Sequence, residues 1–357
     1  MTALVTGGCG FIGGAIVRRL VAQGVRVINL DKLTYAATPE ALGHLPIDKY
    51  RLVVGDICDR ALLDRIFETH QPDVVIHAAA ETHVDRSIDG PADFMESNVN
   101  GTFAMLEAAR AQWAGRKGDF RFLHISTDEV YGSLDALAPP FTEASQYAPN
   151  SPYAASKAAA DHLVRAWGET YGLPVLTTNC SNNYGPWQYP EKLIPLMILN
   201  GIEGRELPVY GNGRNIRDWL HVDDHADAVC TVLRHGSIGR TYNIGGNSEL
   251  ENISVVRSIC DRLDERLPGG GGRRRLIRHV ADRAGHDARY AIDAGLIRKE
   301  LGWMPSRSFE RGLANTVDWY IENTDWWKQI RANSYDGHRL GSIKPAAPPA
   351  GEHRAAV

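Results

Sequence analysis

The chain has 357 residues, a formal net charge of −4, and apolar and charged fractions of 43% and 23%. These fractions are typical of a globular protein, and the length suffices for two domains or one enlarged domain around a large core. The small net charge implies neither a nucleic-acid partner nor an anionic membrane surface, and we expect neither.

The five cysteines are scattered along the chain and show neither Cys-x-x-Cys pairs nor metal-ligand spacing. We therefore expect reduced thiols in a cytoplasmic protein. No metal site is expected, because His221, His225, His279 and His286 do not share such spacing either. The first residues contain no basic region and no long apolar segment, which supports neither secretion nor a membrane span.

The chain opens with a predicted strand at residues 2–6, a glycine turn and a helix. Gly7, Gly10 and Gly13 follow the strand at three-residue intervals, and a helical apolar pattern continues from Ala15. Such a turn lets the backbone approach a pyrophosphate closely and directs a helix N-terminus at the phosphates. The glycine turn alone is weak evidence for a dinucleotide site.

A second predicted strand, residues 25–30, ends before Asp31. An acid at this distance from the glycine turn is suited to bind the adenosine ribose hydroxyls of NAD, and it would repel the additional phosphate of NADP. Capping of the next segment is the alternative role for Asp31. Its place at a strand end after the turn favours cofactor binding.

Further strands are predicted at residues 51–57, 73–80 and 120–125, with an amphipathic helix at 98–111. This alternation predicts an α/β fold with a doubly wound parallel sheet. Asp56 and Ile57 could flank an adenine. The small residues 78–80 either let the backbone pass close to a ligand or simply pack well, and the pattern does not decide between these roles.

The predicted strand at 120–125 leads into Ser-Thr-Asp-Glu-Val-Tyr-Gly at residues 126–132. In an open α/β sheet, ligands bind beyond the carboxyl ends of the strands, so Thr127, Asp128 and Glu129 are placed to meet a substrate. Taken alone, the two acids fit a solvated loop or a helix N-cap better than a catalytic site.

Tyr153 and Lys157 open a helix that is predicted to continue to about Trp167. They are four residues apart and therefore share one helical face. A lysine beside a phenol favours the phenolate, which can accept a hydroxyl proton during hydride transfer to a bound nicotinamide. An isolated Tyr-x-x-x-Lys would mean little, but here it follows a predicted dinucleotide fold.

Together these features resemble the extended short-chain dehydrogenases/reductases, a family that modifies nucleotide sugars. The segment 126–132 is similar to the 4,6-dehydratases within that family, and the same holds for residues 77–87, 179–186, 190–195 and 211–219. The resemblance runs from the N-terminus to about Trp327. It implies a Rossmann-type NAD-binding domain at 1–178 that carries the catalytic residues, and a smaller C-terminal α/β domain at 179–330 that mainly binds substrate.

The resemblance also implies roles for single residues. The catalytic positions are Thr127, Asp128, Glu129, Tyr153 and Lys157. The NAD-contacting positions are Gly7, Gly10, Phe11, Ile12, Gly13, Asp31, Lys32, Leu33, Thr34, Asp56, Ile57, Ala78, Ala79, Ala80, Thr82, Ser97, Tyr153, Lys157 and Asn183. The positions that hold the nucleotide sugar are Thr82, Thr127, Asn182, Lys192, Leu193, Pro208, Val209, Tyr210, Arg217, Asn252, Arg283, His286 and Asp287.

Two of the sugar-binding positions also fit ordinary structural roles. Arg217 precedes a run of acidic and aromatic residues and fits a surface ion pair, whereas Asn252 fits a helix N-cap. The resemblance favours substrate binding for both. It favours contact with a diphosphate for Arg217 and Arg283 in particular.

The activity implied by the resemblance is NAD-dependent loss of water from dTDP-glucose, with UDP-glucose left open as the substrate. Tyr153, aided by Lys157 and Thr127, would take the 4-hydroxyl proton, Glu129 the C5 proton, and Asp128 would protonate the departing 6-hydroxyl. A nucleotide-sugar 4-epimerase or decarboxylase is the alternative within the fold, because it needs the tyrosine and lysine without the acid pair. A non-catalytic NAD sensor is the alternative of another class.

Three further expectations concern assembly and the C-terminal region. The family resemblance suggests a homodimer packed through the helices at 98–111 and 153–167, although apolar helix faces equally serve a monomer core. The Gly/Arg segment 269–275 is interpreted as a solvated loop. The end of the chain, 331–357, is expected to be a tail whose Pro/Ala-rich distal part is disordered.

Overall fold

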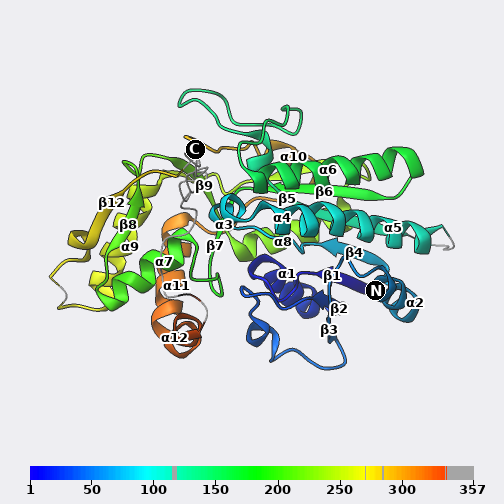
Figure 1. The fold of residues 1–357 in the computed structure, drawn as a ribbon, viewed down its shortest axis with the longest axis horizontal. Coiled ribbons are helices and arrows are strands. Elements are labelled where there is room, and N and C mark those ends of the chain that lie inside the picture. The colour runs from blue at the N-terminus through cyan, green and yellow to red at the C-terminus, as the bar shows by residue number, and fades with distance from the viewer. Residues whose placement is uncertain (115–118, 270, 284, 334, 336–357) are drawn as a thin grey trace, which may run out of the picture.

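The computed structural model describes residues 1–114, 119–269, 271–283, 285–333 and 335. A parallel seven-stranded sheet in the order β10-β6-β5-β4-β1-β2-β3 forms its larger part (Figure 1). The strands are β1 (Thr2–Thr6), β2 (Arg26–Asp31), β3 (Tyr50–Val54), β4 (Val74–His77), β5 (Arg121–Thr127), β6 (Val175–Cys180) and β10 (Thr241–Ile244). The predicted doubly wound parallel sheet is confirmed.

Helices cover both faces of this sheet. On one face lie α1 (Phe11–Ala22), α8 (Val222–His235) and α10 (Gly295–Leu301), and on the other lie α2 (Arg60–His70), α5 (Gly101–Trp113) and α6 (Pro152–Tyr171). Successive residues of β1 point to opposite faces, so Ala3 and Val5 join the core under α1 while Leu4 joins the core under α5. Between α2 and α5 the chain forms α3 (Val84–Asp89) and α4 (Pro91–Phe94).

The smaller part of the molecule lies on the left of Figure 1. Its strands form two sheets, β11-β9-β7 and β12-β8. They are β7 (Asn182–Tyr184), β8 (Leu207–Tyr210), β9 (Ile216–His221), β11 (Glu249–Glu251) and β12 (Ile277–Val280), with helices α7 (Leu193–Glu203), α9 (Asn252–Arg266), α11 (Phe309–Glu322) and α12 (Thr324–Asn333). Their apolar faces enclose a separate core around Trp327 and Tyr320. None of the described helices is long and apolar enough to cross a membrane.

The bounds of several elements differ from the prediction. β3 ends at Val54 and β4 at His77, so residues 55–57 and 78–80 lie in the loops that follow these strands. β5 extends to Thr127, which pairs with Cys180. The predicted helix at 98–111 is a π-helical turn η2 (Met95–Asn100) followed by α5. The Asn98 side chain bonds the backbone N–H and C=O of Glu81, which ties this turn to the loop after β4.

The interpretation of segment 269–275 as a solvated loop is wrong for Arg273. This residue is buried and begins the short 3₁₀ helix η4 (Arg273–Leu276). Its guanidinium donates to the carbonyl oxygens of Gly201, Leu263 and Leu267 and pairs with Asp264. It therefore links the C-terminal end of α9 to that of α7. Gly270 and most of the tail, 334 and 336–357, lie outside the described residues.

Candidate active site

A cavity of about 290 Å³ opens at the carboxyl ends of β1, β2, β4, β5 and β6. All five predicted catalytic residues line it. It is also lined by the predicted cofactor residues Gly7, Gly10, Phe11, Ile12, Gly13, Asp31, Lys32, Thr34, Ile57, Ala78, Ala79, Ala80, Thr82, Ser97 and Asn183, and by Asn182 and Lys192 from the sugar-binding set. Leu33 and Asp56 lie outside the lining.

The glycine turn between β1 and α1 has no room for side chains at Gly7 and Gly13. At Gly7, whose φ is +70°, an added β-carbon would lie 2.6 Å from the Cα of Ala79. At Gly13 it would lie 2.1 Å from the carbonyl oxygen of Gly7. The turn thus brings three backbone segments together at the N-terminus of α1, where free N–H groups and the helix dipole favour a phosphate.

Asp31 ends β2 at the same rim of the cavity. Its Oδ2 accepts the N–H of Cys9 at 2.9 Å and its Oδ1 accepts the N–H of Leu33 at 2.8 Å. These bonds fix the carboxylate, and each oxygen keeps a lone pair for a ribose hydroxyl. The side chain of Lys32 lies alongside, donating to Ser97 Oγ at 3.2 Å. Glycine turn and acid together fit the adenosine half of NAD.

A short 3₁₀ helix, η3 (Asp128–Tyr131), follows β5 and carries the two acids. Its N-cap is Thr127, whose Oγ1 accepts the N–H of Glu129 at 3.3 Å and donates to Asp128 Oδ1 at 3.4 Å. Asp128 is only 2% exposed, and its Oδ2 has no hydrogen-bond partner among the described residues. The alternatives of solvated loop acids or an N-cap are therefore wrong for Asp128.

The two acids have different electrostatic surroundings. Burial raises the pKa of Asp128 well above its ordinary value, and the nearby carboxylates of Glu129 and Asp218 raise it further. Burial also raises the pKa of Glu129, but the cations Arg283, Arg217 and Lys192 act against that rise. Asp128 is therefore suited to hold a proton and Glu129 to accept one, a division that neighbouring acids in catalytic sites commonly show.

Tyr153 and Lys157 lie on the face of α6 that packs against β5. Burial, followed by the charge of Glu129, raises the pKa of the Tyr153 phenol well above its ordinary value. Lys157 Nζ donates to the carbonyl oxygen of Ile125 at 2.8 Å. It also lies 3.4 Å from His124 Nε2. Both Tyr153 and Lys157 line the cavity, as their shared helical face predicts.

The remaining predicted sugar-binding residues lie outside the cavity lining, on the smaller part of the molecule. They are Leu193, Pro208, Val209, Tyr210, Arg217, Asn252, Arg283, His286 and Asp287. Tyr210 donates to Asp85 Oδ2 at 3.0 Å, and Arg283 pairs with Asp85 at 3.4 Å. These contacts join the smaller part of the molecule to α3 beside the cavity.

The ordinary structural roles considered for Arg217 and Asn252 are wrong. Arg217 is buried, donates to the carbonyl oxygen of Asp287 at 3.0 Å and lies over the Tyr290 ring. The N-cap of α9 is Glu251, and Asn252 is the first helical residue. Its buried Oδ1 has no hydrogen-bond partner among the described residues, which leaves it available to a ligand.

Several residues of the cavity wall were not predicted. Arg86 bonds Glu191 at 2.9 Å, Tyr35 donates to the same carboxylate at 2.8 Å, and the Arg86 guanidinium lies 3.9 Å from the centre of the Tyr35 ring. Glu191 and Tyr189 line the cavity. These residues are far apart in the sequence and show no shared spacing. The only signals were the family-like segments 77–87 and 190–195, which contain Arg86 and Glu191.

Among the described residues, no group of three His, Cys, Asp or Glu side chains is arranged to hold a metal ion. The five cysteines form no disulfide.

Comparison with known proteins agrees with the activity that the residues of this site indicate. The family described as GDP-mannose 4,6 dehydratase matches residues 4–316. The chain is 54% identical to the dTDP-glucose 4,6-dehydratase of Escherichia coli over 96% of this chain and all of the relative. It is 55% identical to the probable dTDP-glucose 4,6-dehydratase of Sinorhizobium fredii, over 97% and 100% of the two chains.

Solved structures give the same result. A dTDP-glucose 4,6-dehydratase from Streptomyces venezuelae, crystallised with NAD bound, matches with a TM-score of 0.85 and 47% identity over 92% of this chain and 100% of that one. A UDP-glucose 4-epimerase from Thermotoga maritima matches with a TM-score of 0.81 but only 27% identity, over 91% and 100%. The chain therefore belongs to the nucleotide-sugar 4,6-dehydratase family of extended short-chain dehydrogenases/reductases, among the dTDP-glucose 4,6-dehydratases.

Proposed function

We propose that this chain is an NAD-dependent lyase that converts dTDP-glucose to dTDP-4-keto-6-deoxyglucose and water. The observation that carries the proposal is the pair Asp128 and Glu129, held beside Tyr153 in one cavity where burial raises the pKa of both acids but three cations oppose the rise at Glu129. Relatives that are at least 54% identical over nearly the whole chain carry the same activity in their names. That similarity supports the thymidine nucleotide.

NAD fits the cleft at the glycine turn of β1 and α1 and at Asp31. When bound, NAD supplies the two-electron oxidation at C4 of the sugar and the matching reduction at C6. The protein positions it so that no second substrate is needed and the cofactor is recycled in each turnover. The acid at Asp31 disfavours the extra phosphate of NADP.

Tyr153 accepts the proton of the sugar 4-hydroxyl. Because burial and Glu129 raise the pKa of Tyr153, its phenolate depends on positive charge. We assign that charge to Lys157, which lines the same cavity. The Thr127 hydroxyl at the end of β5 lies beside both the phenol and Asp128, where it can orient the substrate hydroxyl. The resulting 4-ketone acidifies the hydrogen at C5.

Glu129 then removes the C5 proton while Asp128 gives its proton to the departing 6-hydroxyl, which leaves as water. The unpartnered Oδ2 of Asp128 is the atom suited to that transfer. After reduction at C6, Glu129 returns its proton to C5. Tyr153 ends with one proton more and Asp128 with one proton less, so the loss of one from the phenol and the gain of one by the acid restore the enzyme. One water is lost in total, and oxidation at C4 with reduction at C6 leaves the overall oxidation state of the sugar unchanged.

We assign the binding site of the nucleotide diphosphate to the cations that lie near Glu129. Arg217, Arg283 and Lys192 all act on the Glu129 carboxylate, so their charges converge on one region. Guanidinium groups suit the paired oxygens of a diphosphate. UDP-glucose dehydration is the alternative that shares this chemistry, because nothing in these contacts distinguishes thymine from uracil.

A 4-epimerase and an NAD sensor are weaker alternatives. The epimerase of Thermotoga maritima shares the fold, yet an epimerase has no need for a protonated acid next to a base. A sensor has no need for either. The buried and differently tuned Asp128 and Glu129 favour the dehydratase over both.

The test of the acid pair compares Glu129→Gln and Asp128→Asn with wild-type protein. Loss of a general acid or base lowers such rates by about 10²- to 10⁴-fold, so both variants are expected to fold, bind NAD and lose most dehydration. The Glu129→Gln protein is expected to oxidise C4 without losing water. The absorbance of reduced nicotinamide reports the oxidation, and the mass of the product reports the loss of water. Wild-type dehydration by Glu129→Gln would refute the proposal.

The division of labour between residues 1–178, 179–330 and the tail from 331, the homodimer and the cytoplasmic location belong to the same proposal. For the dimer, the support is the apolar surface of α5 and α6, where Phe103 is 48% and Tyr171 is 44% exposed. Free thiols support the reducing cytoplasm. Phe103→Glu is expected to yield monomers in light scattering, whereas an unchanged mass would argue against this surface.

A further inference from the structure

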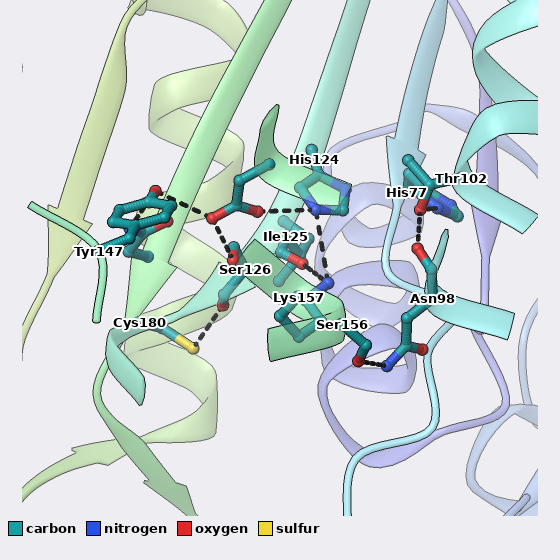
Figure 2. Close-up of polar contacts among 12 residues, drawn as sticks. His77, Asn98, Thr102, His124, Ile125, Ser126, Tyr147, Ser156, Lys157 and Cys180 are labelled. Carbon is teal, nitrogen blue, oxygen red and sulfur yellow. Dashed lines mark hydrogen bonds and ion pairs between the residues drawn. The ribbon is translucent and has the colours of Figure 1, made fainter. Parts of the chain in front are cut away.

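A buried polar network lies behind the catalytic lysine, between β5 and α6 (Figure 2). Asp161 is one helical turn after Lys157 on α6, so both side chains share a face. That face packs against His124 in the middle of β5. The three side chains are 6%, 4% and 0% exposed, respectively, which is unusual for a carboxylate and an ammonium.

The contacts form a continuous path. Lys157 Nζ lies 3.4 Å from His124 Nε2, and the same ring nitrogen lies 3.1 Å from Asp161 Oδ1. The other oxygen, Asp161 Oδ2, accepts the hydroxyls of Ser126 at 2.8 Å and Tyr147 at 2.9 Å. Figure 2 shows His124 between Lys157 on one side and Tyr147 and Ser126 on the other.

His124 separates the ammonium from the carboxylate without carrying a charge of its own. Burial lowers the pKa of His124 well below its ordinary value, so the ring is neutral. The approach of its Nε2 to Asp161 Oδ1 is not a hydrogen bond, because that oxygen has no hydrogen-bond partner among the described residues. The hydroxyls of Ser126 and Tyr147 donate to the other oxygen and favour the ionised carboxylate.

A buried ammonium needs a compensating charge. Burial lowers the pKa of Lys157, and Asp161 is the first charge that acts against this fall. In return, the charge of Lys157 lowers the pKa of Asp161. Burial outweighs this effect, so the pKa of Asp161 is raised to about 6. The mutual effect identifies the carboxylate as the counter-ion of the catalytic lysine.

We propose that Asp161 is a positioning residue whose charge, acting across His124, keeps the Lys157 ammonium charged and directed at the carbonyl oxygen of Ile125. The carboxylate touches neither the cavity nor a reacting atom, so its effect reaches the chemistry only through Lys157. The proposal rests on the role assigned to Lys157 in the proposed function.

The other groups that face this pair carry no compensating negative charge at neutral pH. Tyr153 of α6, Tyr147 and Tyr131 keep their protons because burial raises their pKa values. On the neighbouring strands, His77 of β4 is neutral because burial lowers its pKa, and Cys180 of β6 stays a thiol because burial raises its pKa. The remaining neighbour is His162 of α6, which acts on Asp161 as a cation when protonated.

The test is the pH profile of kcat/KM for Asp161→Asn, a change that keeps the shape and removes the charge. Without the counter-ion, Lys157 loses its proton at lower pH. The alkaline limb should therefore move to lower pH by about one unit, the shift that a close opposite charge produces. A folded Asp161→Asn protein with the wild-type limb would overturn the proposal.

Matched variants separate charge from packing. Tyr147→Phe removes one donor to Asp161 but keeps the carboxylate, so its alkaline limb should stay in the wild-type position. Asp161→Glu restores the charge and should return the limb toward wild type even if the rate stays low. If Asp161→Asn does not fold, Asp161→Ser replaces it, because this change removes the same charge with a smaller side chain, and a shift in the same direction is expected. An unshifted limb would then overturn the proposal.

The pH dependence of NAD affinity, measured by calorimetry, keeps this test independent of turnover. As pH rises, the NAD affinity of Asp161→Asn should begin to fall at a lower pH than that of the wild type. The reason is that Lys157 loses its proton earlier in this variant, and the charge of Lys157 favours NAD binding. Superimposable affinity profiles would overturn the role of Asp161. Failure of wild-type protein to dehydrate any nucleotide sugar would instead refute the proposed function.

Discussion

Asp128 and Glu129 are neighbours in the chain but differ in what surrounds them. Asp128 is buried close to the carboxylates of Glu129 and Asp218, with Arg217 acting in the opposite direction, whereas Glu129 is close to three cations. Because the reaction needs Glu129 ionised and both Asp128 and Lys157 protonated, activity is expected to fall at both ends of the pH range. The rate should fall with decreasing pH through the raised pKa of Glu129, and with increasing pH as Asp128 and Lys157 lose their protons.

Asp128 also links activity to stability. The pKa of Asp128 is raised in the folded protein. Its contribution to the free energy of unfolding is therefore fully present below the pKa that Asp128 has in the unfolded chain, and it is lost as pH rises through the pKa that Asp128 has in the folded protein. Asp128→Asn removes this titration. We expect the variant to have a higher melting temperature than wild type at neutral pH, with the difference shrinking in acid, while dehydration is lost.

Calorimetric melting from acidic to neutral pH measures this difference. The control is Asp135→Asn on the protein surface, for which no such gain is expected. A destabilised Asp128→Asn at neutral pH would mean that the carboxyl group is held ionised, contrary to its role as the acid.

At the scale of elements, the loop between β1 and α1 offers a graded test. A β-carbon at Gly13 would lie 2.1 Å from the carbonyl oxygen of Gly7, whereas one at Gly10 would lie 3.2 Å from the same atom. Gly13→Ala should therefore open the turn and abolish NAD binding, and Gly10→Ala should weaken it less. Fluorescence titration with NAD compares the two. Equal loss in both variants would contradict the geometric account.

The end of α9 depends on Arg273 in a way that its sequence did not suggest. Arg273→Ala would leave buried carbonyl oxygens without donors, and each charged hydrogen bond lost costs about 1.5–3 kcal/mol. We expect a drop of roughly that size or more in the free energy of unfolding. Arg274→Ala, which breaks only an exposed pair with Asp261, is the control and should have little effect.

Denaturant unfolding of both variants decides this point. Equal stability of Arg273→Ala and Arg274→Ala would show that the buried guanidinium contributes nothing to the fold. The sequence could not reveal its role, because three consecutive arginines after a glycine run are typical of a solvated loop. Only the tertiary fold brings the carbonyl of Gly201 next to Arg273.

At the scale of the whole molecule, the sequence predicted what depends on local order. The strand, turn and helix around Gly7, the acid pair after β5, and the spacing of Tyr153 and Lys157 are local patterns, and each has the expected place in the sheet. Element ends were less accurate, since side chains such as Asn98 fix them through distant contacts.

Contacts between distant segments could not be predicted. Arg86 with Glu191 and Tyr210 with Asp85 pair residues more than one hundred positions apart, and no periodicity links them. The direction of Lys157 toward Ile125 was also missed, because helical spacing gives the face of a side chain but not its partner. Burial, which sets the protonation of Asp128, is likewise a property of the assembled fold.

The central claim is most directly tested by incubating the purified protein with dTDP-, UDP-, CDP- and GDP-glucose in turn. NAD is present far below the substrate concentration, and products are identified by mass. The account predicts loss of one water from dTDP-glucose, in molar excess over the added NAD. Loss of water from none of the four, or conversion of dTDP-glucose to an isomer of unchanged mass, would contradict it.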